Sequence, residues 1–281
     1  MLFTVLDTLS LSGDPNKPND DAFGHIDTAA VVLDGATSLG DPLMPGDSDA
    51  AWIAHFGARR LMAHMRDGDA PLDALRHALG DAQKSFEALR RAAPKEKWQI
   101  PSASMMFVSS IPAGFEALFF GDCVALVARP GAPVEVVGEA FDKKAAESRR
   151  AAKLAKEKGV APASRANLPE FLEALRAARN HINSGSHWAF TPEPRAADHV
   201  RQASVPAPPG SHLLLASDGF LAIASDYGRY SAHTLMDKAI AKGLGILADE
   251  LREIEDADPQ GHKFPRFKKS DDATAVLLRL A

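Results

Sequence analysis

Two short apolar runs in this sequence end in the same way, with an aspartate followed by a glycine. Asp34-Gly35 follows the run AAVVL, and Asp218-Gly219 follows the run HLLLAS. Runs this short are typical of buried strands, and a strand end is a place where a rigid sheet can aim a side chain into a shared site. Glycine after the aspartate lets a backbone carbonyl approach a bound ion closely. The pattern favours a sheet protein that carries acidic groups at its strand ends.

Helical periodicity and turn signals divide the first half of the chain. Helices are predicted over residues 48–66, where Ser48 or Asp49 can cap the first turn, and over 70–92. Alternation and apolar runs between turn signals predict the strands. These are 1–11, two within 22–33 around a turn at Asp27, 103–110, 115–120, 123–129 and 134–137. The last four lie close together in sequence, which predicts an antiparallel meander.

The second half is predicted to be mainly helical with two buried strands. Helices are expected over 142–158, 168–181 and 232–255, strands over 211–217 and 273–280, and a further short strand over 186–190. The stretch SVPAPPG is read as a loop, as are residues 256–270. No linker divides the chain, so we expect one α+β domain over residues 1–281, with sheets packed inside helices.

Composition and charge argue against several classes of function. The chain is 46% hydrophobic and no run approaches the roughly 20 apolar residues that cross a bilayer, so no membrane association is expected. Asp7 interrupts an N-terminal segment without basic residues, which indicates a strand and not a signal peptide. The net charge of −5 gives no basic field for nucleic acid. Cys123 is the single cysteine, which suits the reducing cytoplasm.

Two further acidic pairs lie beside predicted strands. Asp20-Asp21 precede one strand, and Asp271-Asp272 precede the last. Four acidic points that converged would repel one another without a cation, and an oxygen-only ligand set suits magnesium or manganese. The competing interpretation is that Asp-Gly marks ordinary turns. The residues alone leave both interpretations open, because they do not prove that the pairs meet in space.

Five motifs resemble those of the type 2C metal-dependent protein phosphatases, and they occur in that family's order from one end of the chain to the other. They are NDDAF (19–23) for N-E-D-A, VVLDG (31–35) for V-x-D-G, FFGDCVALV (119–127) for strand–GDSR–strand, LLLASDGF (213–220) for L-x-x-x-S-D-G, and SDDATAVLLRL (270–280) for D-N-x-T-x-x-x-V.

This resemblance implies an α-β-β-α sandwich of two antiparallel sheets and a dinuclear magnesium or manganese site at one end of the sheets. By position it implies that residues 142–185 form the family's helical insert or flap. It also implies a role for each acidic residue by its position in the motifs. The implied roles are Asp20, Asp34 and the Gly35 carbonyl for one ion, Asp34, Asp218 and Asp271 for the other, Asp21 for bound water, and Asp122 for a weaker third ion.

The sequence departs from the family pattern at the phosphate-handling positions. Ala36 and Thr37 stand where histidine or methionine and glycine are usual, so the proposed general-acid histidine has no counterpart. Asn16 replaces the arginine that holds the phosphate. Lys17 beside it is the candidate substitute, although a lysine offers a point charge and not a two-pronged fork. Asp20 replaces a glutamate and is one methylene shorter.

Two functional hypotheses follow from the resemblance. In the first, a metal-activated water attacks a phosphate monoester on a phosphorylated protein, with Asp34, Asp218 and Lys17 as catalytic residues; a small phosphorylated molecule is a further possible substrate. In the second, the chain is a weak or inactive relative that binds a phosphorylated partner. The retained aspartates favour the enzyme, and the missing arginine favours the binding protein. The basic residues of 263–269 could attract such a partner or belong to a solubilising loop.

Overall fold

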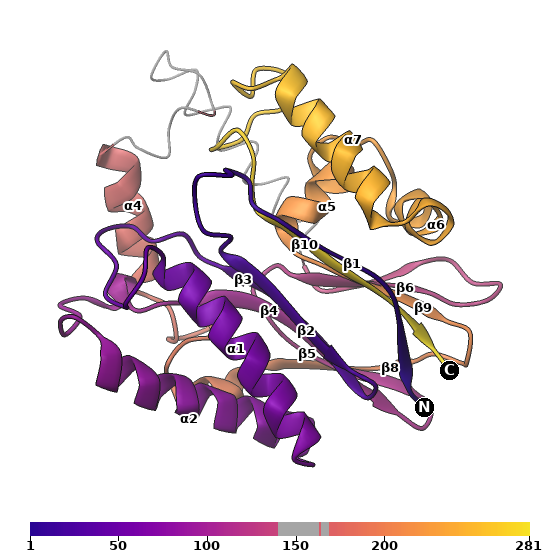
Figure 1. Ribbon diagram of the computed structural model, residues 1–281, viewed down its shortest axis with the longest axis horizontal. Helices are drawn as coiled ribbons and strands as arrows, with labels where there is room; N and C mark the ends of the chain where they lie inside the picture. Colours follow the sequence, from indigo (N-terminus) through magenta and orange to yellow (C-terminus); the bar gives the residue numbers. More distant parts are fainter. Residues whose placement is uncertain (140–162, 164–168) are drawn as a thin grey trace.

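The computed structural model describes residues 1–139, 163 and 169–281, and its centre is a pair of antiparallel sheets packed face to face (Figure 1). One sheet has the strand order β1-β10-β9-β6-β7, and the other has the order β2-β3-β4-β5-β8. Helices α1 and α2 cover the outer side of the second sheet, and α5, α6 and α7 cover the outer side of the first. The predicted α-β-β-α sandwich is confirmed.

The elements follow one another as four groups along the chain. The first is β1 (Phe3–Leu11), β2 (Asp21–Ile26), β3 (Ala29–Gly35), α1 (Asp49–Arg66), α2 (Pro71–Leu89) and the short 3₁₀ helix η1 (Lys97–Gln99). The second is β4 (Ala103–Ile111), β5 (Gly114–Phe120), β6 (Val124–Ala128) and β7 (Glu135–Val137). The third is α4 (Pro169–Arg179), η3 (Pro194–His199), β8 (Arg201–Pro206) and β9 (His212–Ala216). The last is α5 (Asp218–Ser225), α6 (Ala232–Lys242), α7 (Leu244–Ala257) and β10 (Ala273–Leu280).

The run AAVVL of β3 is apolar throughout because both faces of the strand are buried. Val31 and Leu33 pack with Ile53 and the rest of the α1–α2 layer. Ala30 and Val32 point the other way, into the core between the sheets. Alternate strand residues face opposite sides of a sheet, so a strand covered on both sides requires a continuous apolar sequence.

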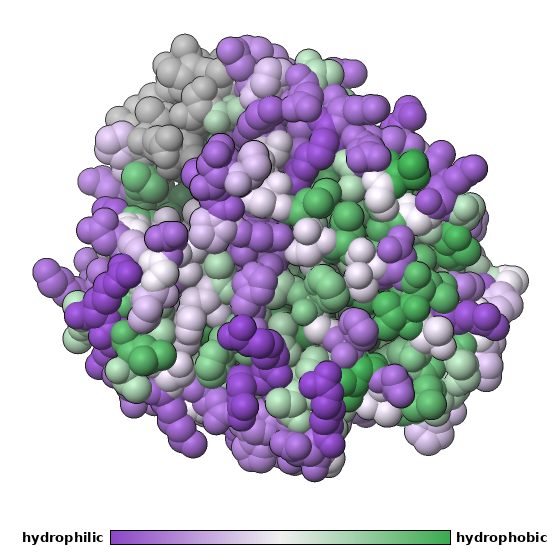
Figure 2. Space-filling view, in the orientation of Figure 1, coloured by the Kyte–Doolittle hydropathy of each residue, from purple (hydrophilic) through white to green (hydrophobic). Residues whose placement is uncertain are grey.

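The two ends of the chain pair with each other. Strand β1 lies antiparallel to β10, from Phe3 opposite Leu280 to Leu11 opposite Ala273, which brings the residues before β10 next to the loop after β1. Figure 2 shows polar and apolar side chains mixed over this face of the molecule. Within the described residues, no helix has both the length and the apolar character needed to cross a bilayer.

The predicted meander from 103 to 137 is wrong. Strands β4 and β5 form a hairpin in one sheet, whereas β6 and β7 form a hairpin in the other. The chain changes sheets at Gly121, whose φ of +71° is accessible at little cost to glycine. The short turn between β5 and β6 is therefore a crossover between the two sheets. It places Asp122 beside Ser104 of β4.

Other boundaries also differ from the sequence predictions. The stretch read as a loop contributes Ser204–Pro206 to β8, an edge strand where proline removes no needed ladder bond. The helix predicted over 232–255 is broken at Gly243, with φ of +82°, into α6 and α7. Residues 186–190 form isolated bridges and no strand. The predicted helix 142–158 lies outside the described residues, as does most of the expected insert.

Candidate metal centre

The pairing of β2 with β3 sets two aspartates side by side. Asp21 lies directly opposite Asp34 in the antiparallel register, and directly opposed residues project from the same face of a sheet. On the other side of β3, Asp34 lies opposite Ser104, whose hydroxyl donates to Asp122 Oδ1 at 2.7 Å. Three acidic residues from separate segments thus approach one end of the second sheet.

The first sheet supplies two more aspartates at the same end. Strand β9 ends just before Asp218, which begins α5, and β10 begins just after Asp271 and Asp272. The backbones are in contact there, because a Cβ on Gly219 would lie 2.0 Å from the Asp272 carbonyl oxygen. Glycine at 219 is therefore required by this close approach, in addition to any role beside an ion.

The pKa of Asp34 is raised by burial and by the charges of the other aspartates. Burial is the largest cause that raises its pKa well above the usual range, and the charges of Asp218, Asp21 and Asp271 raise it further. Asp122 adds a smaller effect in the same direction. The apolar strand ends have therefore brought these carboxylates close enough to oppose one another's ionisation.

Asp21 is the most deeply buried member of the group. The residue is 1% exposed, and its Oδ2 atom has no hydrogen-bond partner among the described residues. Burial raises its pKa well above the usual range; the Ser217 hydroxyl lowers it, and the charges of Asp271 and Asp218 raise it again. A buried carboxylate oxygen without a partner is unusual in a folded protein and calls for an explanation.

Asp20 faces a different set of groups. The Ser48 hydroxyl donates to its Oδ1 atom, and its backbone N–H donates to Asp272 Oδ2 at 2.6 Å. Burial is again the main cause that raises its pKa, with a contribution from Asp272. Asp34 is not among the principal causes. In this geometry Asp21, and not Asp20, is the acidic neighbour of Asp34.

Lys268 is a functional candidate that sequence reasoning did not single out from its basic run. Its Nζ atom pairs with Asp271 Oδ1. Partial burial lowers the pKa of Lys268, but the charge of Asp271, with smaller contributions from Asp34 and Asp218, shifts it upward overall. The ammonium group is therefore a positive charge within the field of the aspartates. Its position three residues before Asp271 was the available signal.

Two other basic side chains of the same run, Arg266 and Lys269, form ion pairs within the protein, whereas Lys17 is more exposed. Arg266 pairs with Asp258 at 3.1 Å, and Lys269 pairs with Asp256 at 2.6 Å. Lys17, in the loop before β2, has a side chain 76% exposed and lies 3.8 Å from Asp14. Lys17 is thus accessible and weakly held, whereas the run at 263–269 largely stabilises its own loop.

A tighter group of potential ligands lies elsewhere. Among the described residues, one ligand atom each from His64, Asp69 and His77 come within 4.8 Å of one another, near the junction of α1 and α2. His64 Nε2 also lies 2.9 Å from Asp81 Oδ2, and Arg60 Nε donates to the same oxygen at 2.7 Å. Arg60 already supplies positive charge to this network, which accounts for it without an ion.

The aspartates at the sheet ends fit a hard divalent cation. Every side-chain donor in the group is a carboxylate oxygen, the ligand type that magnesium and manganese prefer. The buried and unpartnered Oδ2 of Asp21 and the raised pKa values of Asp21 and Asp34 indicate that positive charge would stabilise the group. Asp34, Asp21, Asp218, Asp271, Asp122 and the Gly35 backbone are the residues that the fold gathers here.

Two antiparallel sheets between helix layers, with aspartates gathered at one end, define the class of two-sheet α-β-β-α proteins with an acidic site. The sequence profile described as protein phosphatase 2C matches residues 14–250, and the chain belongs to this family. A search of curated protein sequences gave no significant match.

Solved structures of this class have the same fold at low sequence identity. The PPM Ser-Thr phosphatase MsPP from Mycobacterium smegmatis, in complex with cacodylate, is 18% identical with a TM-score of 0.58, over 99% of this chain and 100% of that one. The serine/threonine phosphatase PstP/Ppp of Mycobacterium tuberculosis is 15% identical with a TM-score of 0.58, over 100% and 99%. PppA of Pseudomonas aeruginosa is 15% identical with a TM-score of 0.54, over 100% and 99%.

Proposed function

We propose that this chain hydrolyses phosphate monoesters on proteins, with phosphoserine or phosphothreonine as substrate and divalent cations as cofactor. The observation that carries the proposal is the convergence of Asp21, Asp34, Asp218 and Asp271 at one end of the two sheets, with a buried carboxylate oxygen left without a partner. Membership of the protein phosphatase 2C family supports the same reaction class.

Asp34, Asp218, Asp271 and the Gly35 carbonyl would hold the cations, and Asp122 would contribute to a weaker third site. The neighbour structures support this choice of ion, because the catalytic domain of PstP was crystallised with two manganese ions and RsbX with magnesium. Bound divalent ions would lower the pKa of water toward neutrality and polarise a phosphoryl oxygen. Asp21 lies opposite Asp34 and would complete the ligand set, while Asp20 would act through its contact with Ser48.

The proposed reaction also needs a group that binds the phosphate and a proton for the leaving group. Lys17 is exposed and lies 3.8 Å from Asp14, so its ammonium can move to a bound phosphate with little loss of existing contacts. Ala36 cannot donate a proton, so the leaving group would take its proton from solvent. A phosphorylated protein is the proposed substrate because the matched family is one of protein phosphatases. The single cysteine suits a cytoplasmic setting.

A direct assay tests this proposal. The protein is incubated with para-nitrophenyl phosphate and with a phosphothreonine peptide, each with manganese or with a chelator. We expect manganese-dependent turnover of both, abolished in Asp34→Asn and retained in Asp237→Asn, which alters an exposed carboxylate on α6. Binding of the phosphopeptide without turnover would refute the proposal and favour a phosphate-binding role.

A further inference from the structure

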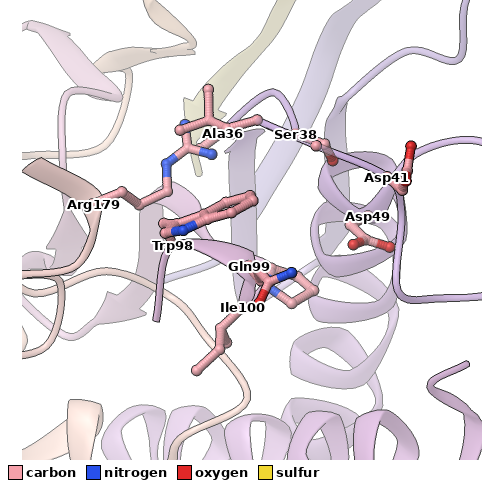
Figure 3. Close-up of a pocket in the computed structure, with 11 residues that line it drawn as sticks. Ala36, Ser38, Asp41, Asp49, Trp98, Gln99, Ile100 and Arg179 are labelled. Atoms are coloured by element: carbon pink, nitrogen blue, oxygen red, sulfur yellow. The ribbon is translucent and has the colours of Figure 1, made fainter. Parts of the chain in front are cut away.

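A pocket lies beside the loop that follows the candidate metal centre. Ala36, the residue directly after Gly35, forms one part of its wall, and Arg179 at the end of α4 reaches it from another direction (Figure 3). The Cα of Ala36 is two peptide steps from that of Asp34, so the two lie within about 7.6 Å. The pocket thus adjoins the aspartates through the backbone of residues 34–36.

The guanidinium of Arg179 has unused hydrogen-bonding capacity. Its described contact is a donated bond from Nη1 to the Thr37 carbonyl oxygen at 2.9 Å, and no carboxylate pairs with it among the described residues. A guanidinium carries five N–H donors. Burial lowers the pKa of Arg179 to about 10, so the group remains charged at neutral pH.

A second polar group in the pocket has no hydrogen-bond partner among the described residues. The Ser38 hydroxyl oxygen is buried without a hydrogen-bond partner among the described residues, and Ser38 lines the same pocket. The Ser38 hydroxyl and the Arg179 guanidinium line the same pocket, and both can donate hydrogen bonds to the oxygens of an anion.

The acidic residues of the pocket do not compete for Arg179. The Asp49 carboxylate accepts hydrogen bonds from the backbone N–H groups of Leu43 and Met44, at 2.8 and 2.7 Å. Asp41 is exposed, and in Figure 3 both acidic residues lie at the opposite end of the view from Arg179. The end of the pocket beside Ala36 is therefore the end with net positive charge.

The neighbouring arginine of α4 shows what a purely structural role looks like here. Arg176 donates from Nε to the Leu39 carbonyl oxygen at 3.1 Å and stacks over the Trp98 ring at 4.5 Å. Its guanidinium thus has both a hydrogen-bond acceptor and an aromatic face. Arg176 already fastens α4 to the loop, so this anchoring alone does not account for Arg179.

We propose that Arg179 binds the phosphoryl group of the substrate and supplies from α4 the guanidinium that Asn16 does not provide. The inference rests on the proposed function, since it takes the phosphoryl group to lie at the aspartates beside Ala36. An arginine can donate hydrogen bonds to two phosphoryl oxygens at once, whereas the ammonium of Lys17 acts as a point charge.

The test measures the Kd of inorganic phosphate for the manganese-loaded protein by calorimetry, and the KM for para-nitrophenyl phosphate. Arg179→Ala should weaken phosphate binding at least about tenfold, as expected when a charge-assisted pair is lost. Arg179→Lys should lose less, because it keeps the charge. Arg179→Gln keeps a donor for the Thr37 carbonyl and should lose as much as alanine.

Arg176→Ala is the matched control, because it removes a contact with the same loop from the same helix. It should leave the phosphate Kd unchanged, while the manganese Kd stays constant in all four variants. Equal phosphate affinity in Arg179→Ala and Arg176→Ala would overturn the inference. A loss confined to peptides with acidic residues next to the phosphoresidue would overturn it too, since the pocket would then bind a carboxylate.

The inference and the proposed function can fail separately. A protein that turns over no substrate, yet binds phosphate through Arg179, would refute the hydrolase and keep this site. A protein with full manganese-dependent turnover and unchanged phosphate binding in Arg179→Ala would support the hydrolase and refute the role of Arg179.

Discussion

Replacing Asp21 by asparagine should stabilise the metal-free protein, even though the side chain is almost completely buried. The carboxylate is 1% exposed, has an oxygen without a hydrogen-bond partner, and lies within the field of Asp271 and Asp218. Asparagine keeps nearly the same shape, removes the negative charge, and adds an amide that can donate to the carboxylate of Asp34 opposite. Relief of charge repulsion and the new hydrogen bond should both stabilise the folded, metal-free protein.

The size of the effect follows from the cost of a buried unsatisfied polar group, about 1–3 kcal/mol. Unfolding entropy for a chain of this length is about 0.6 kcal/mol per kelvin. The metal-free Asp21→Asn protein should therefore melt about 2–5 °C higher than the wild type at pH 8, as measured by calorimetry in the presence of a chelator.

The stability that Asp21→Asn adds to the metal-free protein should increase with pH. The pKa of Asp21 is raised in the folded state, so the folded protein keeps this proton at pH values where the unfolded chain has lost it. The stability from this group is fully present below the unfolded carboxyl pKa, about 3.9, and is lost as the pH rises through the folded value. The advantage of Asp21→Asn should grow over that window and then level off.

Asp49 is the matched control, because it is another buried aspartate, 5% exposed. Its two oxygens accept hydrogen bonds from Leu43 and Met44. Asp49→Asn replaces one acceptor by a donor, so the same substitution should lower the melting temperature. A lower or unchanged melting temperature in metal-free Asp21→Asn at pH 8 would refute the reasoning that the cluster is held under charge repulsion.

Substitutions at three further positions, with Gly245 as a control, test other parts of the account. Asp218→Asn should weaken manganese binding at least about tenfold, or 1.4 kcal/mol, by calorimetry; unchanged affinity would remove Asp218 from the site. Lys17→Ala should raise the KM for an aryl phosphate while Lys17→Arg preserves it, and wild-type kinetics in the alanine variant would exclude lysine from phosphate handling. Gly35→Ala should lower the melting temperature, because a Cβ there would lie 2.5 Å from the Ala50 and Asp20 carbonyl oxygens. Gly245→Ala meets no atom within 4 Å and should be neutral or stabilising; equal effects of the two glycine changes would contradict the packing seen at Gly35.

The architecture could be predicted because local pattern and burial agree in this chain. The run before Asp34 is apolar throughout, as a strand buried on both faces must be, and residues 213–216 before Asp218 are likewise apolar and buried. Helix α1 begins after Ser48, which accepts a hydrogen bond from the Ala51 N–H at 3.1 Å, as its capping pattern predicted. The edge strand β8 was missed because Pro206 resembles a loop signal.

The details of the site depend on register and on contacts between distant segments. Asp20 and Asp21 are adjacent in sequence, and a shift of one residue in the β2–β3 pairing would exchange their faces. Sequence alone could not settle which of them lies beside Asp34. Helix α5 was missed because its interior residues are buried all round, so it shows no amphipathic period.

Arg179 illustrates the limit of sequence reasoning most clearly. It lies far along the chain from Thr37, whose carbonyl it contacts, and no motif links the two segments. Only the docking of α4 against the loop after β3 brings its guanidinium to the pocket that Ala36 lines.

Anomalous diffraction at the manganese absorption edge, from crystals of the protein grown with manganese, tests the central claim most directly. The account predicts peaks within coordination distance of the Asp34 and Asp218 carboxylates at the ends of β3 and β9, about 2.0–2.6 Å for oxygen ligands. It would be contradicted by well-ordered aspartates without anomalous density, or by density confined to the His64, Asp69 and His77 group.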